Sequence, residues 1–229
     1  MSAVTAVTVQ DTNGVHAVHP VPADIVREQI RTCLRDIGAD AIKTGMLASD
    51  AIANAVADAL AEFPGIPLVL DPVLASTGGA VLLGPEALHT LKTRLFPRAL
   101  LVTPNMPETE TLTGIRIETF DDMRIAADEF AGFGVPHVLF KGGHGAGKTV
   151  IDTLVDTQSG AIVRFESPRI DTRHTHGTGC TLASAIACGL ARKLPLADSV
   201  RRAHDFVQNA IRTAPGLGGG QGPLNHLPG

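Results

Sequence analysis

The chain has 229 residues, of which 44% are hydrophobic and 18% charged, so it can bury a sizeable core and is not disordered by composition. Its net charge of −4 and lack of Trp and Tyr argue against a nucleic-acid binder, which needs excess cations and stacking faces. No apolar run approaches the roughly 20 residues of a membrane span, and the start does not resemble a signal peptide. Three cysteines cannot build a disulfide framework, so we expect a cytoplasmic protein without membrane partners.

Apolar, β-branched runs alternate with amphipathic stretches over the first two thirds of the chain. Strands are predicted at 4–9, 41–44, 67–70, 99–103 and 137–141, and helices at 23–37, 50–62, 85–95 and 120–133. This alternation indicates βαβ units, and therefore an α/β fold with a mostly parallel sheet between helical layers. Residues 1–9 are interpreted as a strand from the interior of such a unit.

The pattern changes after residue 149. Segments 150–155 and 161–165 flank the polar turn Asp-Thr-Gln-Ser-Gly, which predicts an antiparallel hairpin at a sheet edge. Helices are predicted at 179–192 and 196–212, and the Gly- and Pro-rich tail from Pro215 is expected to be irregular. Because no linker divides the chain, we expect one domain spanning residues 1–229.

One segment matches a phosphate-binding loop by pattern alone. Residues 142–149 read GGHGAGKT, and they follow a predicted strand. A phosphate loop works only if a helix begins at its lysine, so that backbone amides and the helix dipole converge on the phosphates. The next residues, VIDTLV, alternate as a strand does, so we interpret the loop as a β–β connection.

A stronger motif lies before the first C-terminal helix, where residues 172–181 read TRHTHGTGCT. Gly177, Thr178 and Gly179 fall at the helix start, where unpaired amides and the positive end of the dipole favour an anion. Cys180 falls in the first turn, where a lowered thiol pKa is expected, so it is a candidate nucleophile or base. The alternative is a tight helix entry with Cys180 as a buried small residue.

For the other cysteines and for two neighbouring histidines we predict no catalytic or metal-binding role. Cys33 and Cys188 lie inside amphipathic helices with apolar neighbours, so packing explains them. His174 and His176 share a polar loop, but no third ligand accompanies them at metal spacing, so a zinc site is not predicted.

Polar side chains end three predicted strands. Asp71 ends PLVLDPV, Asn105 and Glu108 follow LLVTPNMPE, and Lys141 ends HVLFKGG. The carboxyl ends of parallel strands meet at one sheet edge, so two carboxylates and a lysine gathered there could hold Mg²⁺ and polyphosphate. Each also has an ordinary alternative: a turn residue for Asp71, a helix start for Glu108, and an edge lysine for Lys141.

The motifs VTVQDTNGV, IKTGML, VLDPVL, VTPNMPE, KGGH and HGTGCT resemble the hydroxymethylpyrimidine/phosphomethylpyrimidine kinases of the ribokinase-like superfamily. The resemblance covers residues 2–190, and it is specific because most ribokinase-like sugar kinases carry Asp where this chain has Cys180. It implies a three-layer α/β/α ribokinase-like domain, usually a homodimer. It also implies ATP- and Mg²⁺-dependent phosphorylation of 4-amino-5-hydroxymethyl-2-methylpyrimidine, then of its monophosphate, in thiamine biosynthesis.

The resemblance also implies residue roles. Gln10 would hydrogen-bond the aminopyrimidine, whose edge matches the donor and acceptor of a side-chain amide, and Met46 would pack against the ring. The remaining roles are the anion hole (Gly177, Thr178, Gly179), the base for the substrate hydroxyl (Cys180), ATP phosphate contacts (Lys141, Asn105) and Mg²⁺ (Asp71, Glu108).

The sequence departs from the family pattern in two places. Arg173-His174 replaces a frequent Lys-Asn, with the positive charge kept. The strand, Gly-rich loop and helix with which the family begins have no counterpart before Met1. We therefore expect a marginally stable, aggregation-prone chain, because an unpaired strand edge would be exposed. Alternatives are a pyridoxal or pyridoxine kinase, or a truncated remnant that binds ligand without turnover.

Overall fold

The main sheet of the computed structural model, which describes residues 1–75, 79, 82–145 and 147–227, has six strands in chain order. They are β3 (Ile42–Thr44), β4 (Leu68–Leu70), β5 (Leu101–Val102), β6 (His137–Phe140), β7 (Thr149–Asp156) and β8 (Ile162–Pro168). The pairings from β3 to β6 are parallel, and those of β6 with β7 and β7 with β8 are antiparallel. The mostly parallel sheet and the edge hairpin are therefore confirmed.

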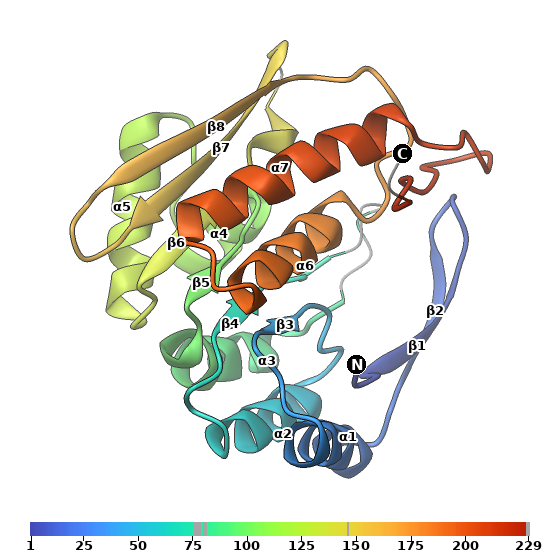
Figure 1. Ribbon diagram of the computed structural model, residues 1–229, viewed down its shortest axis with the longest axis vertical. Coiled ribbons are helices and arrows are strands. Elements are labelled where there is room, and N and C mark those ends of the chain that lie inside the picture. Colours follow the sequence, from blue (N-terminus) through green and yellow to red (C-terminus); the bar gives the residue numbers. More distant parts are fainter. Residues whose placement is uncertain (76–78, 80–81, 146, 228–229) are drawn as a thin grey trace.

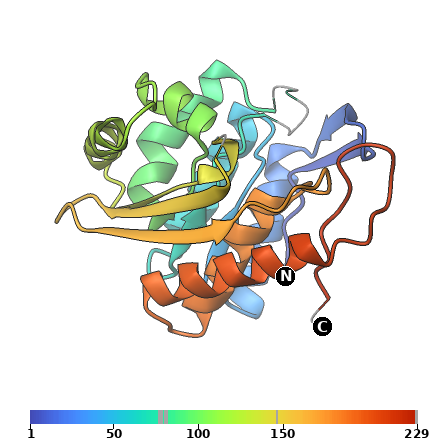
Figure 2. The same ribbon diagram turned by 90° about the horizontal axis from the view of Figure 1, so that it is seen from above.

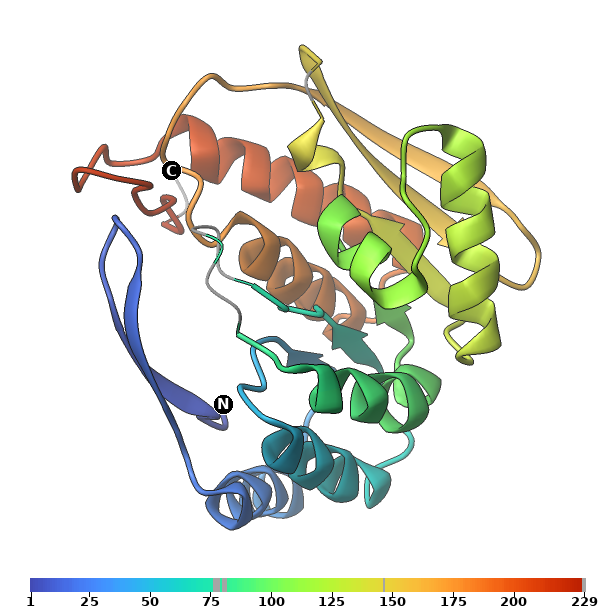
Figure 3. The same cartoon turned by 180° about the vertical axis from the view of Figure 1, so that it is seen from behind.

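Helices cover both faces of this sheet, which confirms the three-layer α/β/α architecture (Figures 1 and 2). One layer contains α1 (Ala23–Asp36), α2 (Asp50–Ala61), α3 (Pro85–Thr90), α4 (Met106–Thr113) and α5 (Phe120–Gly132), seen in front in Figure 3. The other contains α6 (Thr178–Ala191) and α7 (Leu196–Arg212). In the described part of the chain, no helix has the length and hydrophobicity needed to cross a bilayer.

Two hydrophobic cores separate the three layers. Leu68 and Leu70 point into the core under α1 to α5, whereas Val69 between them points into the core under α6 and α7. All three are fully buried, because successive side chains of a strand point to opposite faces and both faces are covered. Burial on both faces explains why these strands read as continuous apolar runs.

The first predicted strand exists but does not join this sheet. β1 (Ala6–Gln10) pairs antiparallel with β2 (Val15–Pro20) in a separate two-stranded ribbon, so placing it inside an α/β unit was wrong. Strand propensity does not specify a partner, and a turn closed by the Asp11 carboxylate returns the chain onto β1. Val7 and Val9 consequently stay 58% and 61% exposed.

The glycine-rich loop after β6 connects two strands, as predicted. β7 begins at Thr149, where a phosphate-binding loop would need a helix. Ala146 in that loop lies outside the described residues.

The outer strand β3 borders a groove of about 650 Å³. Its walls are Ile30, Cys33 and Leu34 of α1 on one side and Ala187 and Cys188 of α6 on the other. The edge of β3 is therefore flanked by largely apolar helix surfaces.

Candidate active site

The carboxyl ends of β4, β5 and β6 bring three predicted side chains together. Lys141 Nζ lies 2.7 Å from Asp71 Oδ1 and 3.6 Å from Glu108 Oε2. Asp71 and Glu108 are buried, at 2% and 7% exposure. The chain thus holds a cation between two buried carboxylates at the sheet edge where α/β proteins place their ligands.

Local structure fixes each carboxylate. Thr103 Oγ1 donates to Asp71 Oδ1 at 3.1 Å. Asn105 and Glu108 form a capping box on α4, in which Glu108 Oε2 accepts from the Asn105 amide and Asn105 Oδ1 accepts from the Glu108 amide, each at 2.8 Å. Glu108 therefore caps the first turn of α4 and also faces Lys141. The cap uses the backbone amide and the side-chain oxygen of Asn105. Its side-chain nitrogen, Nδ2, is left as the donor suited to phosphate.

Burial and neighbouring charges shift the pKa values of Glu108 and Lys141. Burial raises the pKa of Glu108, and the Lys141 ammonium offsets this only in part. Burial opposes the charge of Lys141, but Asp71 and Glu108 outweigh it and raise the pKa of Lys141. Lys141 therefore stays charged in the site.

A second lysine, which the sequence analysis did not single out, approaches the same carboxylate. Lys43 Nζ on β3 lies 3.9 Å from Asp71 Oδ2. Gly45 makes room for it, because a Cβ there would lie 2.6 Å from Lys43 Nζ. The available signal was a single charged residue inside the predicted strand AIKT.

The start of α6 abuts this cluster. Gly177 adopts a φ of 84°, a left-handed conformation that favours glycine, and Thr178 Oγ1 donates to the Thr175 carbonyl at 2.7 Å. A Cβ on Gly179 would lie 3.2 Å from Lys141 Nζ. The first amides of a helix have no intrahelical acceptor, so the predicted anion-binding segment faces the same space as Lys141.

The expected lowering of the Cys180 pKa is wrong. Cys180 is exposed as a residue, yet the surrounding protein desolvates its thiol and the Asp71 carboxylate lies close to it. Burial and Asp71 raise the pKa of Cys180, and Lys43 and Lys141 offset the shift only in part. The helix start is present, but desolvation and a neighbouring carboxylate outweigh it.

The two residues predicted to contact the pyrimidine, Gln10 and Met46, lie in different places. Gln10, at the end of β1, has its Nε2 3.5 Å from Nε2 of His176, the neighbour of Gly177. Met46 instead lines the groove beside β3, whose described lining includes no other predicted site residue, and its carbonyl accepts from Thr5 Oγ1. Gln10 therefore lies beside the start of α6, whereas Met46 lies in the groove beside β3.

The C-terminal glycine-rich segment holds the hairpin that carries Gln10. The Gln221 amide donates to the Thr12 carbonyl at 2.7 Å, and the Gly220 amide donates to Thr12 Oγ1 at 3.2 Å. A Cβ on Gly220 would overlap the Thr12 carbonyl. Figures 1 and 3 show the two segments side by side.

The donor set suits a hydrated magnesium ion. The described residues contain no group of three or more His, Cys, Asp or Glu side chains able to enclose a metal. Mg²⁺ typically keeps several waters and binds through one or two carboxylates plus substrate phosphates. Asp71 and Glu108, both within reach of Lys141, fit that arrangement.

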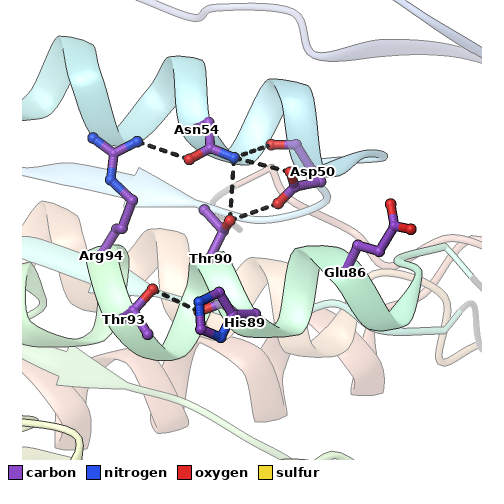
Figure 4. A pocket seen from close by; sticks show the side chains of 7 residues that line it. All are labelled: Asp50, Asn54, Glu86, His89, Thr90, Thr93 and Arg94. Carbon is purple, nitrogen blue, oxygen red and sulfur yellow. Dashed lines mark hydrogen bonds between the residues drawn. The ribbon is translucent and has the colours of Figure 1, made fainter.

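A second hollow, of about 560 Å³, lies between α2 and the helical segment that starts with α3 (Figure 4). Thr90 Oγ1 donates to Asp50 Oδ1 at 2.5 Å, and Arg94 Nη1 donates to Asn54 Oδ1 at 2.7 Å. These bonds tie the two helices together, and none of the predicted site residues lines the hollow.

The fold has three α/β/α layers, and its sheet edge holds two carboxylates and a lysine beside a helix that starts at glycine. These features are typical of ribokinase-like small-molecule kinases, which transfer a phosphoryl group from ATP. The family model described as phosphomethylpyrimidine kinase matches residues 1–225. The chain belongs to this family.

The names of similar proteins agree with this family assignment. A hydroxymethylpyrimidine/phosphomethylpyrimidine kinase of Streptomyces coelicolor is 46% identical over 226 residues, which cover 99% of this chain and 82% of the relative. A thiamine biosynthesis bifunctional protein of Geobacter sulfurreducens is also 46% identical, but the chain spans only 46% of its length.

Solved structures include two kinds of kinase. A phosphomethylpyrimidine kinase from Clostridium difficile is 36% identical with a TM-score of 0.80, covering 92% of this chain and 86% of that one. An ADP complex of Bacillus subtilis pyridoxal kinase is 32% identical with a TM-score of 0.88, covering 99% and 85%.

Proposed function

We propose that this chain transfers the γ-phosphoryl group of ATP to the hydroxymethyl group of 4-amino-5-hydroxymethyl-2-methylpyrimidine, and then phosphorylates the resulting monophosphate to the diphosphate. The observation that carries the proposal is the contact of Lys141 with Asp71 and Glu108 beside the start of α6. Phosphoryl transfer needs donors and cations placed around the moving group, with little covalent chemistry from the protein.

The residues divide the work by charge. Gly177, Thr178 and Gly179 would form the anion hole around the oxygens of the transferred group, and Lys141 would neutralise charge that builds up on the phosphates. Asp71 and Glu108 would hold a hydrated Mg²⁺, which would supply further positive charge for the phosphates.

In the first phosphorylation, the substrate oxygen forms a bond to the γ-phosphorus, the bond to ADP breaks, and the hydroxyl proton must leave. The Cys180 thiolate would take that proton on Sγ. Because the pKa of Cys180 is raised, only a small fraction of the thiol is in this form at neutral pH. In the second phosphorylation the acceptor is an ionised phosphate, so no base is required.

Gln10 would recognise the aminopyrimidine edge, because its amide supplies both a donor and an acceptor and it lies beside His176. Met46, two residues after the end of β3, would contact the ring of a substrate that reaches towards that strand.

The experiment is ATP consumption by the purified chain with Mg²⁺ and either the pyrimidine alcohol or its monophosphate. The control is Lys141→Met, which keeps most of the side-chain length and removes the charge, and it is assayed at a temperature where circular dichroism shows that it is folded. We expect turnover that the control lacks. Absence of turnover, combined with ligand-dependent stabilisation, would support the non-catalytic binder instead.

A pyridoxal kinase is the second candidate, favoured by the TM-score of 0.88 to the Bacillus subtilis enzyme. Comparing kcat/KM for pyridoxal and for the pyrimidine alcohol under the same conditions decides between the two. Our proposal requires the larger value for the pyrimidine alcohol.

We also propose that the protein is a homodimer. Val7 and Val9 point to the same face of the β1–β2 hairpin and are more than half exposed, which suits a second copy. Light scattering should give twice the chain mass, and replacing both valines by threonine should shift the protein to the monomer.

A further inference from the structure

A buried acid, Asp152, lies on β7 outside the cluster described above. It is 6% exposed, and it points into the core beneath α6 and α7, which otherwise contains apolar side chains such as Leu154 and Phe165. Burying a carboxylate among apolar groups is costly unless it has partners. The partners of Asp152 must therefore account for its presence in this core.

The partners of Asp152 lead back to the active site. Its Oδ1 accepts a hydrogen bond from the Gly142 amide at 2.8 Å, and Gly142 directly follows Lys141. A Cβ on Gly142 would overlap the Ile151 carbonyl, so only glycine lets the chain approach β7 this closely. On the other side, His204 Nε2 of α7 lies 3.8 Å from Asp152 Oδ2 and is itself buried.

We infer that Asp152, covered by His204, is a positioning residue that anchors the Gly142 amide and thereby sets the point from which Lys141 reaches Asp71 and Glu108. The inference rests on the proposed function for the role of Lys141 in phosphoryl transfer.

Electrostatics agree with this geometry. Burial raises the pKa of Asp152, and the Gly142 amide, His204 and Lys141 each oppose that rise. The Lys141 charge therefore favours the ionised anchor. A hydrogen bond to a carboxylate is roughly twice as strong as one between neutral groups, which suits an anchor for the Gly142–Gly143 pair.

Two substitutions separate the acceptor from the charge. Asp152→Asn keeps an oxygen that can accept from Gly142 and loses the charge, whereas Asp152→Ala removes both. The matched control is Ser199→Ala, a fully buried polar residue of α7 that bonds to the Pro195 carbonyl, with no bond to the Lys141 segment.

Two measurements are made on each full-length variant. Steady-state kinetics with the pyrimidine alcohol should show kcat falling about tenfold or more for Asp152→Ala, with KM changed less than about threefold, because the reacting groups are misplaced while binding surfaces remain. Asp152→Asn should retain most of kcat. Ser199→Ala should lower the melting temperature without lowering kcat.

Amide hydrogen exchange at Gly142 is the second measurement and does not require activity. Exchange should be at least about tenfold faster in Asp152→Ala than in the wild type, and unchanged in Ser199→Ala. If exchange is unchanged in Asp152→Ala, or if its kcat falls no more than that of Ser199→Ala, the inference is wrong. A wild-type chain without turnover would refute the proposed function alone, and Gly142 exchange would still decide whether Asp152 is the anchor.

Discussion

Replacing Cys180 by alanine should affect the two phosphorylations unequally. The acceptor of the first is a neutral hydroxyl that must lose a proton, whereas the acceptor of the second is an ionised phosphate. If the Cys180 thiolate takes the proton, the first step loses its base and the second loses nothing essential. The amides at the start of α6 and Lys141 are unchanged by the substitution and would continue to serve both steps.

The expected magnitude follows from the environment of the thiol. A general base contributes typically 10²- to 10⁴-fold. Burial and Asp71 raise the pKa of Cys180 above its ordinary 9.0, so at pH 7 fewer than about one thiol in a hundred is ionised. The loss in the first step at pH 7 should therefore be near the lower limit, about 10²-fold. Below the raised pKa the thiolate fraction grows about tenfold per pH unit, so the wild-type rate should rise with pH up to that pKa.

The assay measures ADP release with the alcohol or the monophosphate as acceptor, between pH 6.5 and 9. Cys188→Ala is the matched control, because Cys188 is an exposed thiol further along the same helix. We expect Cys180→Ala to abolish the rise of the first step with pH and to leave the second step within a few-fold of the wild type.

Equal losses in both steps would show that Cys180 contributes through packing or anion binding and not as a base. A wild-type first step that does not change with pH over this range would refute the thiolate mechanism directly.

Three further predictions concern the surroundings of the site. Lys141→Met leaves the buried Glu108 without its cation and leaves Asp71 with only the more distant Lys43, so urea unfolding should show a loss of up to about 3–5 kcal/mol, and a loss below about 1 kcal/mol would contradict the buried ion cluster. Gly220→Val should push the C-terminal segment off the hairpin tip and raise KM for the pyrimidine about tenfold, about 1.4 kcal/mol, with KM for ATP unchanged; equal rises would contradict this role. The groove beside β3 should bind a fluorescent hydrophobic dye and promote aggregation, and Cys188→Lys in the groove should reduce both more than Ile125→Lys on α5; a reversible, cooperative melt of the unmodified chain would count against this prediction.

Short-range patterns sufficed for most of the fold. Continuous apolar runs such as Leu68–Leu70 identified buried strands, because both faces of a parallel sheet are covered. Alternation around a polar turn identified the β7–β8 hairpin, and the strand after the glycine-rich loop correctly argued against a phosphate-binding loop. The carboxyl-end rule then placed Asp71, Glu108 and Lys141 together.

The sequence by itself therefore determined the layers, the sheet edge that carries the site and the meeting of Asp71, Glu108 and Lys141 there, since all of these depend on local periodicity and chain direction. Only the tertiary structure decided the partner of β1, the approach of Lys43 to Asp71 and the anchor from Asp152 to Gly142. It also reversed the expected pKa shift of Cys180. Each of these depends on which groups from distant segments surround an atom, and desolvation and charge act through space and not along the chain.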